Sequence, residues 1–282
     1  MPPESKGVEA AKMRDLIKQA AGDLAASNHA IVLTGAGIST ESGVPDFRGP
    51  KGVWTTNRQA EAQAYERFER FLNDPVAYWQ EMLGTVGSGS DFYRQMRQVA
   101  PNPGHHAIAR LEQLGIVKWT ITQNVDGLHE KAGTQRVMHY HGTVEKLRCI
   151  SCGSRFGIDE YSLKKLPPLC RCGRPLKYDV VHLSEPIPSD VMDVAEEEAM
   201  KCDLMLVCGT SAVVYPFAAL PSMARSRGRG NSGVKIIEVN AEPTPLTRQG
   251  TSDYLIQGKT GEILPLVVDE VSKLVSRGGK HG

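Results

Sequence analysis

Short apolar runs alternate with longer amphipathic stretches along most of this 282-residue chain. Runs rich in aliphatic residues predict strands at 30–34, 117–122, 203–208 and 234–239. Apolar residues three and four positions apart, with proline and glycine near the ends, predict helices at 8–27, 103–114, 216–225 and 261–275. Strands and helices that alternate in this way indicate an α/β fold, with a parallel sheet covered by helices on both faces.

Two segments interrupt this alternation. Residues 51–100 are polar and mostly helical in pattern, which predicts a helical insert. Residues 145–178 contain four of the six cysteines and are expected to form a small module of their own. The large domain is therefore expected to consist of residues 1–50, 101–144 and 179–282.

The four clustered cysteines have the spacing of a metal site. They fall in two close pairs, each followed by a glycine: Cys149, Cys152, Cys170 and Cys172. Two such pairs complete a tetrahedron of thiolates and leave no open position, so we predict one structural zinc ion. Four unrelated buried thiols are the alternative, and the paired spacing favours zinc. Cys202 and Cys208 flank a predicted strand and are interpreted as core residues.

Polar or glycine-rich segments begin where three of the predicted strands end, at Gly35, Gln123 and Gly209. Ligands of parallel sheets bind at the carboxyl ends of the strands, so these segments are expected to meet in one cleft. The turn from Gly35 to Gly37 suits a close approach of backbone amides to phosphate, although an ordinary tight turn is an equal reading. The rigid segment 43–48, which ends in Asp-Phe-Arg, favours the nucleotide reading.

Hydrogen-bonding side chains fill the segment 123–126, which suits ribose hydroxyls and a carboxamide. His141 follows another expected strand end. The segments 209–211 and 240–242 also end strands and are candidates for a second nucleoside. Four further histidines are interpreted as structural: His105, His106, His129 and His139.

The net charge of +1 provides no general attraction to nucleic acid or membrane, and we expect neither as a partner. The one short basic cluster, at Arg225, Arg227 and Arg229, is interpreted as a solvated loop. No apolar run approaches the roughly 20 residues that span a bilayer. The N-terminus also lacks the order of a secretory signal. We expect a soluble, intracellular protein in the cytoplasm, with the nucleus left open.

Taken together, these motifs resemble the sirtuin family of NAD-dependent protein deacylases, over about residues 12–275. Six motifs occur in that family's order: GAGIS, GVPDFR, TQNVDGLH, HG, the four cysteines and GTS, with NAE after them. The resemblance implies a Rossmann-like large domain and a small zinc-ribbon module. It also implies that NAD and an acyl-lysine protein or peptide enter the cleft between them from opposite sides.

The resemblance implies that His141 is the general base and that Asn124, helped by Asp126 and Gln123, holds the nicotinamide ribose and carboxamide. Phe47, on a flexible loop, is expected to shield the reacting ribose. The expected cofactor-binding residues are Gly35, Ala36, Gly37, Ser39, Asp46, Phe47, Arg48, Gln123, Asn124, Val125, Asp126, Gly209, Thr210, Ser211, Asn240, Glu242 and Thr260. The acyl peptide is expected to add as a strand that contacts Val181, Leu183, Ser184, Glu185, Val213 and Val214.

The implied reaction moves an acyl group from lysine to the ADP-ribose part of NAD and yields nicotinamide, O-acyl-ADP-ribose and free lysine. A neutral imidazole suits the base role of His141. Long-chain deacylation, mono-ADP-ribosyl transfer and NAD hydrolysis are alternatives that would use the same site. A catalytically idle NAD sensor is a further alternative, which the presence of Asn124, Asp126 and His141 disfavours.

Two positions depart from the family's pattern. Leu183-Ser184-Glu185 stands where a Phe-Gly-Glu-like triplet is usual, so the peptide geometry is open there. Sirtuins that prefer succinyl or malonyl lysine resemble one another in a Tyr-x-x-Arg pair, and the nearest equivalent here is Tyr78-Trp79-Gln80-Glu81. Because Glu81 would repel a carboxylate, we predict neutral acyl groups, acetyl first.

Overall fold

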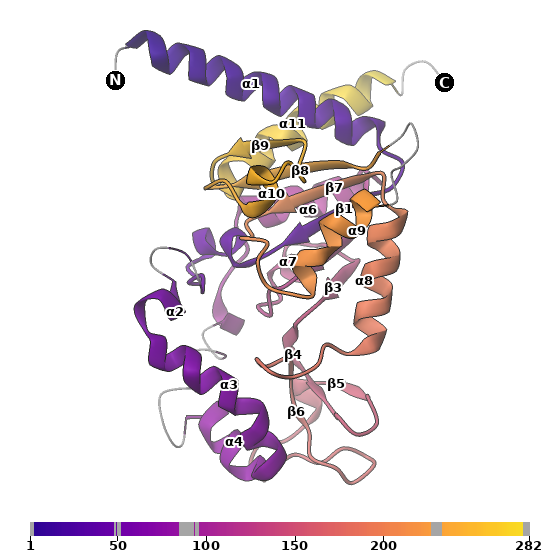
Figure 1. The fold of residues 1–282 in the computed structure, drawn as a ribbon. Coiled ribbons are helices and arrows are strands. Elements are labelled where there is room, and N and C mark those ends of the chain that lie inside the picture. The colour runs from indigo at the N-terminus through magenta and orange to yellow at the C-terminus, as the bar shows by residue number, and fades with distance from the viewer. Residues whose placement is uncertain are drawn as a thin grey trace.

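A computed structural model describes residues 3–47, 49, 52–84, 93, 96–226 and 233–278. Arg48, Arg227 and Arg229 lie outside the described residues. The larger part is a six-stranded parallel sheet in the order β3-β2-β1-β7-β8-β9 (Figure 1). The strands are β1 (Ala30–Thr34), β2 (Val117–Thr122), β3 (Val137–His139), β7 (Leu204–Cys208), β8 (Lys235–Asn240) and β9 (Tyr254–Gln257).

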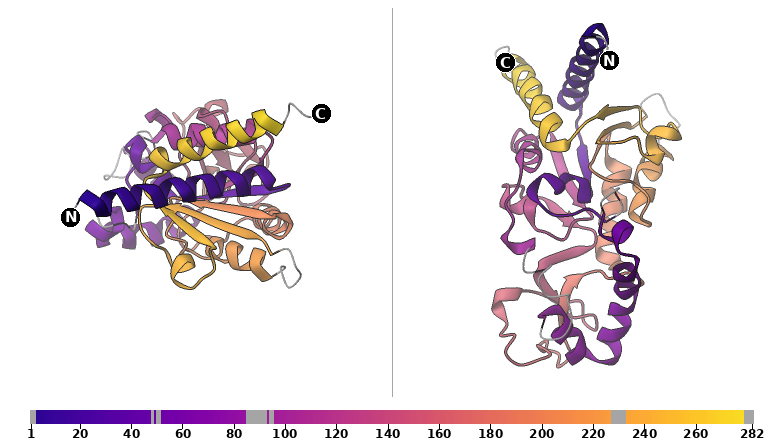
Figure 2. Two further views of the ribbon diagram at one scale, coloured as in Figure 1. Left: turned by 90° about the horizontal axis from the view of Figure 1, so that it is seen from above. Right: turned by 90° about the vertical axis from the view of Figure 1, so that its left-hand side faces the viewer.

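Alternate residues of the strands point to opposite faces of this sheet, as the pleat requires. Val32 packs with one apolar cluster, whereas Ile31 and Leu33 pack with another. The first cluster lies under α1 (Pro3–Ala26), α6 (Pro103–Gln113) and α11 (Thr260–Gly278). The second lies under α8 (Ser189–Lys201), η4 (Phe217–Ala219), α9 (Leu220–Ser226) and α10 (Pro245–Arg248). Figure 2 shows α1 and α11 lying side by side at the end of the molecule that carries both termini.

The second body combines a small antiparallel sheet with a group of helices. The sheet has the order β5-β4-β6 and contains β4 (Gly142–Arg148), β5 (Arg155–Gly157) and β6 (Lys177–Val180), with η3 (Ile158–Glu160) after β5. The helices are α2 (Val53–Thr56), α3 (Arg58–Asn73) and α4 (Pro75–Met82). The side chains of Asn57 and Asp74 accept hydrogen bonds from the first turns of α3 and α4, which explains where these helices begin.

The helices and the small sheet share one apolar core. Trp79 and Met82 of α4 are buried together with Leu147 of β4 and Leu176, which immediately precedes β6. The indole of Trp79 also donates a hydrogen bond of 2.7 Å to the carbonyl of Leu176. The two units therefore form a single body, below the large sheet in Figure 1.

The parallel sheet with helices on both faces is confirmed, and the four predicted strands are present within one residue of their expected limits. The elements that the prediction missed include α8, α10 and the edge strand β9. The segment expected as one helix at 216–225 is a 3-10 turn followed by α9. Within the described ranges, no helix has both the length and the apolar content that crossing a bilayer would require.

Candidate active site

A cleft of about 1090 Å³ opens between the carboxyl ends of the large sheet and the second body. Gln123, at the end of β2, donates from its backbone to Thr34 at 3.0 Å and from its side chain to Thr210 at 2.8 Å. Gly35, at the end of β1, donates to the carbonyl of Cys208 at 3.3 Å. The three strand ends are thus joined by hydrogen bonds around one cavity, as their order in the sheet predicts.

Two glycine turns pack against each other beneath this cavity. The amide of Gly37, in η1 (Ala36–Ile38), donates a hydrogen bond of 2.7 Å to the carbonyl of Gly209. A Cβ atom added at Gly37 would lie 2.7 Å from that carbonyl oxygen, and one added at Gly209 would lie 2.3 Å from the amide of Ile38. Gly209 also has a φ of +58°. Only glycine fits at either position, so the two turns can pack directly against each other.

Three buried polar side chains form the centre of the cleft. The hydroxyl of Ser39 accepts from Asn124 at 3.0 Å, and Asn124 also donates to the carbonyl of Gly35 at 3.1 Å. Asp126 accepts from the backbone of Leu128 at 3.0 Å, at the start of α7 (Leu128–Lys131). Burial raises the pKa of Asp126, and its hydrogen bonds oppose that shift. The amide of Asn124 and the carboxylate of Asp126 are therefore held rigidly at the cleft.

His141 also lines the cleft, two residues after the end of β3 and immediately before β4. Its carbonyl accepts a hydrogen bond of 2.8 Å from the amide of Val181, which ties it to the segment that follows β6. Dense surroundings lower the pKa of His141 to about 4, because desolvation penalises the charged ring. The imidazole is therefore neutral near pH 7, as a general base must be.

The histidines interpreted as structural have internal partners where they are buried. The ring of His129 lies 2.9 Å from the hydroxyl of Thr34, and the ring of His105 accepts a hydrogen bond of 3.3 Å from the backbone of Asn102. Burial lowers the pKa of His105 to about 4 and lowers that of His129 well below its usual value. His139 pairs with Glu130, and His106 is exposed. None of these four lines the cleft.

Most of the predicted cofactor residues come together in this cavity. Asn240 at the end of β8, Glu242 just after it and Thr260 at the start of α11 line it, as do Asp46 and Phe47. The ring of Phe47 packs 4.8 Å from that of Trp54, measured between ring centres. Gly35 lies beside the cavity rather than on its surface. The other described cofactor candidates line it: Ala36, Gly37, Ser39, Gln123, Asn124, Val125, Asp126, Gly209, Thr210 and Ser211.

The residues expected to bind the peptide lie on both sides of the same cleft: Val181, Leu183, Ser184, Glu185, Val213 and Val214. Ser184 has a φ of +70°, and Ala212, on the facing segment, has a φ of +52°. They are the two residues other than glycine with positive φ in the part of the chain that the structure describes. Such strain gathers at functional sites, and here it is located on the two edges of one groove.

Tyr78 and Glu81 do not face the cleft, contrary to the prediction from the sequence. Tyr78 is completely buried, and Glu81 forms ion pairs with Arg67 and Arg70, so neither lines the cleft. The helical insert instead contributes Ala64 and Arg67 to the wall, together with Tyr93 and Met96 further along the chain. Electrostatic repulsion by Glu81 therefore gives no reason to expect neutral acyl groups.

Other cleft residues were also missed, among them Trp54, Ile187, Arg248 and Lys259. The aromatic ring of Trp54 in an otherwise polar stretch was a signal that could have identified it. The remaining residues reach the cleft through tertiary packing, and no local pattern in the sequence marks them.

The four clustered cysteines match the requirements of zinc. Their Sγ atoms all lie within 4.8 Å of one another. The Sγ atoms of Cys149 and Cys172 are 3.6 Å apart, as are those of Cys152 and Cys170. A tetrahedral site with Zn–S bonds of about 2.3 Å has edges of roughly 3.8 Å, so the four thiolates would hold the ion with little movement.

Comparison with known proteins agrees with this geometry. The model of the Sir2 family matches residues 35–216. The NAD-dependent protein deacylase 2 of Pyrobaculum aerophilum is 43% identical over 89% of this chain and 94% of its own length. A Sir2 homologue mutant solved with ADP-ribose has a TM-score of 0.76 at 38% identity, over 93% of this chain and 97% of that one. A Sir2 protein bound to a myristoylated histone peptide has a TM-score of 0.64 at 38% identity, over 93% of this chain and 99% of that one. The chain belongs to the Sir2 family.

Proposed function

We propose that this chain is an NAD-dependent protein-lysine deacylase that releases nicotinamide, O-acyl-ADP-ribose and free lysine. The observation that carries the proposal is that a neutral histidine, His141, lines the same cleft as the buried Asn124–Ser39–Asp126 group. The similarity of this chain to a protein named an NAD-dependent protein deacylase supports the same reaction.

The residues of the cleft suit this chemistry. The paired glycine turns line the cleft without bulky side chains, which would let a diphosphate approach the backbone, and Asn124 and Asp126 offer a donor and an acceptor to a ribose and a carboxamide. NAD would supply the electrophilic sugar carbon and the leaving nicotinamide. His141 would take a proton from a ribose hydroxyl, so that the oxygen can attack the acyl carbon.

The zinc ion is proposed to be structural. Cys149, Cys152, Cys170 and Cys172 would fill its shell, and none of them lines the cleft. The ion would hold β4 and the approach to β6 in place, and these strands carry His141 and the expected peptide segment at their ends.

We propose acetyl-lysine as the first substrate, for a different reason from the one that the sequence suggested. Arg67 is the cation that the helical insert contributes to the described cleft wall, and its ion pair with Glu81 at 3.2 Å offsets much of its charge. The neighbouring wall is apolar and includes Val44, Ala64 and Met96. A neutral acyl group suits these surroundings, and longer fatty acyl chains are the second candidate, given the relative with a myristoylated histone peptide.

Mass spectrometry on acetyl-, succinyl- and myristoyl-lysine peptides with NAD tests the proposal. The expected result is NAD-dependent loss of the acetyl group with O-acetyl-ADP-ribose formed, and no product with His141→Ala. Efficient desuccinylation would contradict the neutral-acyl proposal alone. Nicotinamide release without any deacylated peptide would contradict deacylation and favour ADP-ribosyl transfer or NAD hydrolysis at the same site.

We further propose that the protein acts on acyl-lysine proteins in the cytoplasm. Zinc-binding thiols that must stay reduced support an intracellular location. Imaging of the tagged chain, with fractionation of cells, would test this expectation.

A further inference from the structure

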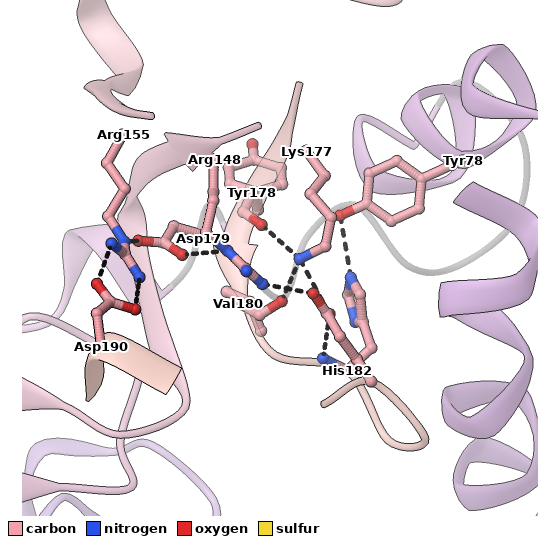
Figure 3. A network of polar contacts seen from close by, with 10 residues as sticks. Tyr78, Arg148, Arg155, Lys177, Tyr178, Asp179, Val180, His182 and Asp190 are labelled. Carbon is pink, nitrogen blue, oxygen red and sulfur yellow. Dashed lines mark hydrogen bonds and ion pairs between the residues drawn. The ribbon is translucent and has the colours of Figure 1, made fainter. Parts of the chain in front are cut away.

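Six charged side chains form a continuous chain of ion pairs between the second body and the large domain (Figure 3). Three are cations and three are anions, so the network is electrically balanced. They come from β4, β5, β6, the segment after β6 and the start of α8. In order of contact they are Asp190, Arg155, Asp179, Arg148, Glu185 and Lys177.

The inner part of this network is almost completely removed from water. The side chain of Lys177 is 0% exposed and that of Glu185 is 3% exposed. Burying paired charges costs desolvation energy that their attraction barely recovers, so such pairs are poor evidence for stability. They do impose a defined geometry on the backbone that carries them.

The carboxylate of Glu185 closes a short loop of backbone. One oxygen pairs with Arg148, and the other lies 3.1 Å from Nζ of Lys177 and accepts a 3.0 Å hydrogen bond from the amide of His182. Lys177 also donates to the carbonyls of Tyr178, at 2.9 Å, and Val180, at 2.6 Å. The segment from Val180 to Glu185 is thus tied to β6 at both ends.

A second anchor holds the same segment to the helical insert. The ring of His182 lies 3.1 Å from the hydroxyl of Tyr78, and both side chains are buried. Figure 3 shows the two rings approaching each other from α4 and from the segment after β6. This anchor accounts for the burial of Tyr78, which the cleft itself does not use.

The anchored segment is one edge of the groove and is bonded directly to the catalytic region. The amide of Val181 donates to the carbonyl of His141, while Leu183 and Ser184 line the cleft. A shift of this segment would move a bound peptide strand relative to His141. The carboxylate of Glu185 and the ring of His182 are occupied by internal partners, so they act on the peptide through the backbone.

We propose that Glu185 and His182 are positioning residues. They hold the segment 181–185 in the position in which a bound acyl-lysine strand is aligned with His141. This inference rests on the proposed deacylase function. It predicts that loss of either anchor weakens use of the peptide and leaves the NAD half of the cleft intact.

Glu185→Gln tests the first anchor, with Glu197→Gln, an exposed partner of Lys201 on α8, as the matched control. For Glu185→Gln the expected result is a fall of about 10-fold or more in kcat/KM for acetyl-lysine peptide, carried mainly by KM. The Kd for NAD should stay within about twofold of the wild-type value. Unchanged kcat/KM in a folded variant, or an equal loss of NAD binding, would overturn the proposal.

Tyr78→Phe tests the second anchor. Because it removes a single hydroxyl, it can still test the positioning role if Glu185→Gln does not fold. It should raise the KM for the peptide about threefold, with NAD binding unchanged. Amide hydrogen exchange gives a readout that needs no catalysis: the amides of 181–185 should exchange faster in both variants than in the control. Unchanged exchange would overturn the positioning role, whereas inactivity of the wild-type chain on every acyl peptide would contradict the proposed function instead.

Discussion

The hydroxyl of Ser39 donates a hydrogen bond of 2.7 Å to Oδ2 of Asp126 while it accepts one from Asn124. One small side chain thereby fixes both of the polar groups that face the cleft from the segment after β2. The ring of His105 lies 3.4 Å from the same hydroxyl, so the one donor and both acceptor positions of Ser39 face polar partners.

Ser39→Ala is therefore expected to leave a carboxylate oxygen and an amide hydrogen of the buried group without their partner. A buried polar group without a partner costs about 1–3 kcal/mol, so kcat/KM for NAD should fall about 10- to 100-fold. Steady-state kinetics measure this change. Ser276→Ala, on the exposed surface of α11, is the control and should have no effect; wild-type kinetics for Ser39→Ala would contradict the role given to this hydroxyl.

Acid should destabilise the fold through its buried histidines. Burial lowers the pKa of both His105 and His141 to about 4 in the folded state, below the ordinary value of 6.5. Between pH 6.5 and 4 the unfolded chain binds protons that the folded chain does not, so the free energy of unfolding falls as the pH falls through this window. At pH 5 each of these two histidines lowers the free energy of unfolding by about 2 kcal/mol.

Chemical denaturation at pH 7 and pH 5 measures this loss. His105→Asn should reduce the difference in the free energy of unfolding between the two pH values. Equal stability of the wild-type chain at the two pH values would contradict the direction of these pKa shifts.

Removal of zinc should unfold the second body and leave the large sheet folded. The metal cysteines Cys149 and Cys170 belong to the apolar core that also contains Trp79 and Phe71, so the helices α3 and α4 should lose their packing as well. We expect elemental analysis to find one zinc ion per chain. The zinc content should fall strongly in Cys149→Ser. Cys202→Ser, at a buried thiol outside the cluster, should keep its zinc; a zinc-free chain with full activity would exclude the structural role.

Ser184→Gly should stabilise the protein. The left-handed backbone at Ser184 costs a residue with a Cβ atom about 1–2 kcal/mol, and the added freedom of glycine in the unfolded chain offsets part of the gain. The expected rise in the free energy of unfolding is roughly 0.5–1 kcal/mol, measured by urea denaturation. Ser162→Gly, at an exposed position without positive φ, is the control and should be neutral or destabilising. A clear loss of stability in Ser184→Gly would contradict the claim that the backbone at Ser184 is strained.

The apolar pattern was enough to predict the large sheet because buried parallel strands are nearly continuous in aliphatic residues. The same rule explains what was missed. The edge strand β9 has four residues, of which one is buried, so it lacks such a run. Helix α8 carries Glu196, Glu197 and Glu198 together, and this acidic run obscures the apolar positions Ala195 and Ala199 that pack on the sheet.

The strand-end rule likewise predicts that Gln123 and Gly209 meet in one cleft, as they do. It could not place Tyr78 or Glu81, because helix packing decides which face of α4 meets the cleft. Here Tyr78 turns toward His182, and Glu81 toward Arg67 and Arg70. Motif spacing carries no information about such partners from another body of the molecule.

The common core of the helical insert and the small sheet has a mechanical consequence. A single unit forms one wall of the cleft, and the chain crosses between it and the other wall at His141–Gly142, at Val180–Val181, and on either side of the helical insert. Rotation about these crossings would change the width of the whole cleft at once. A ligand that touches both walls selects one angle between them, so NAD and an acyl peptide should each make the other's binding more favourable.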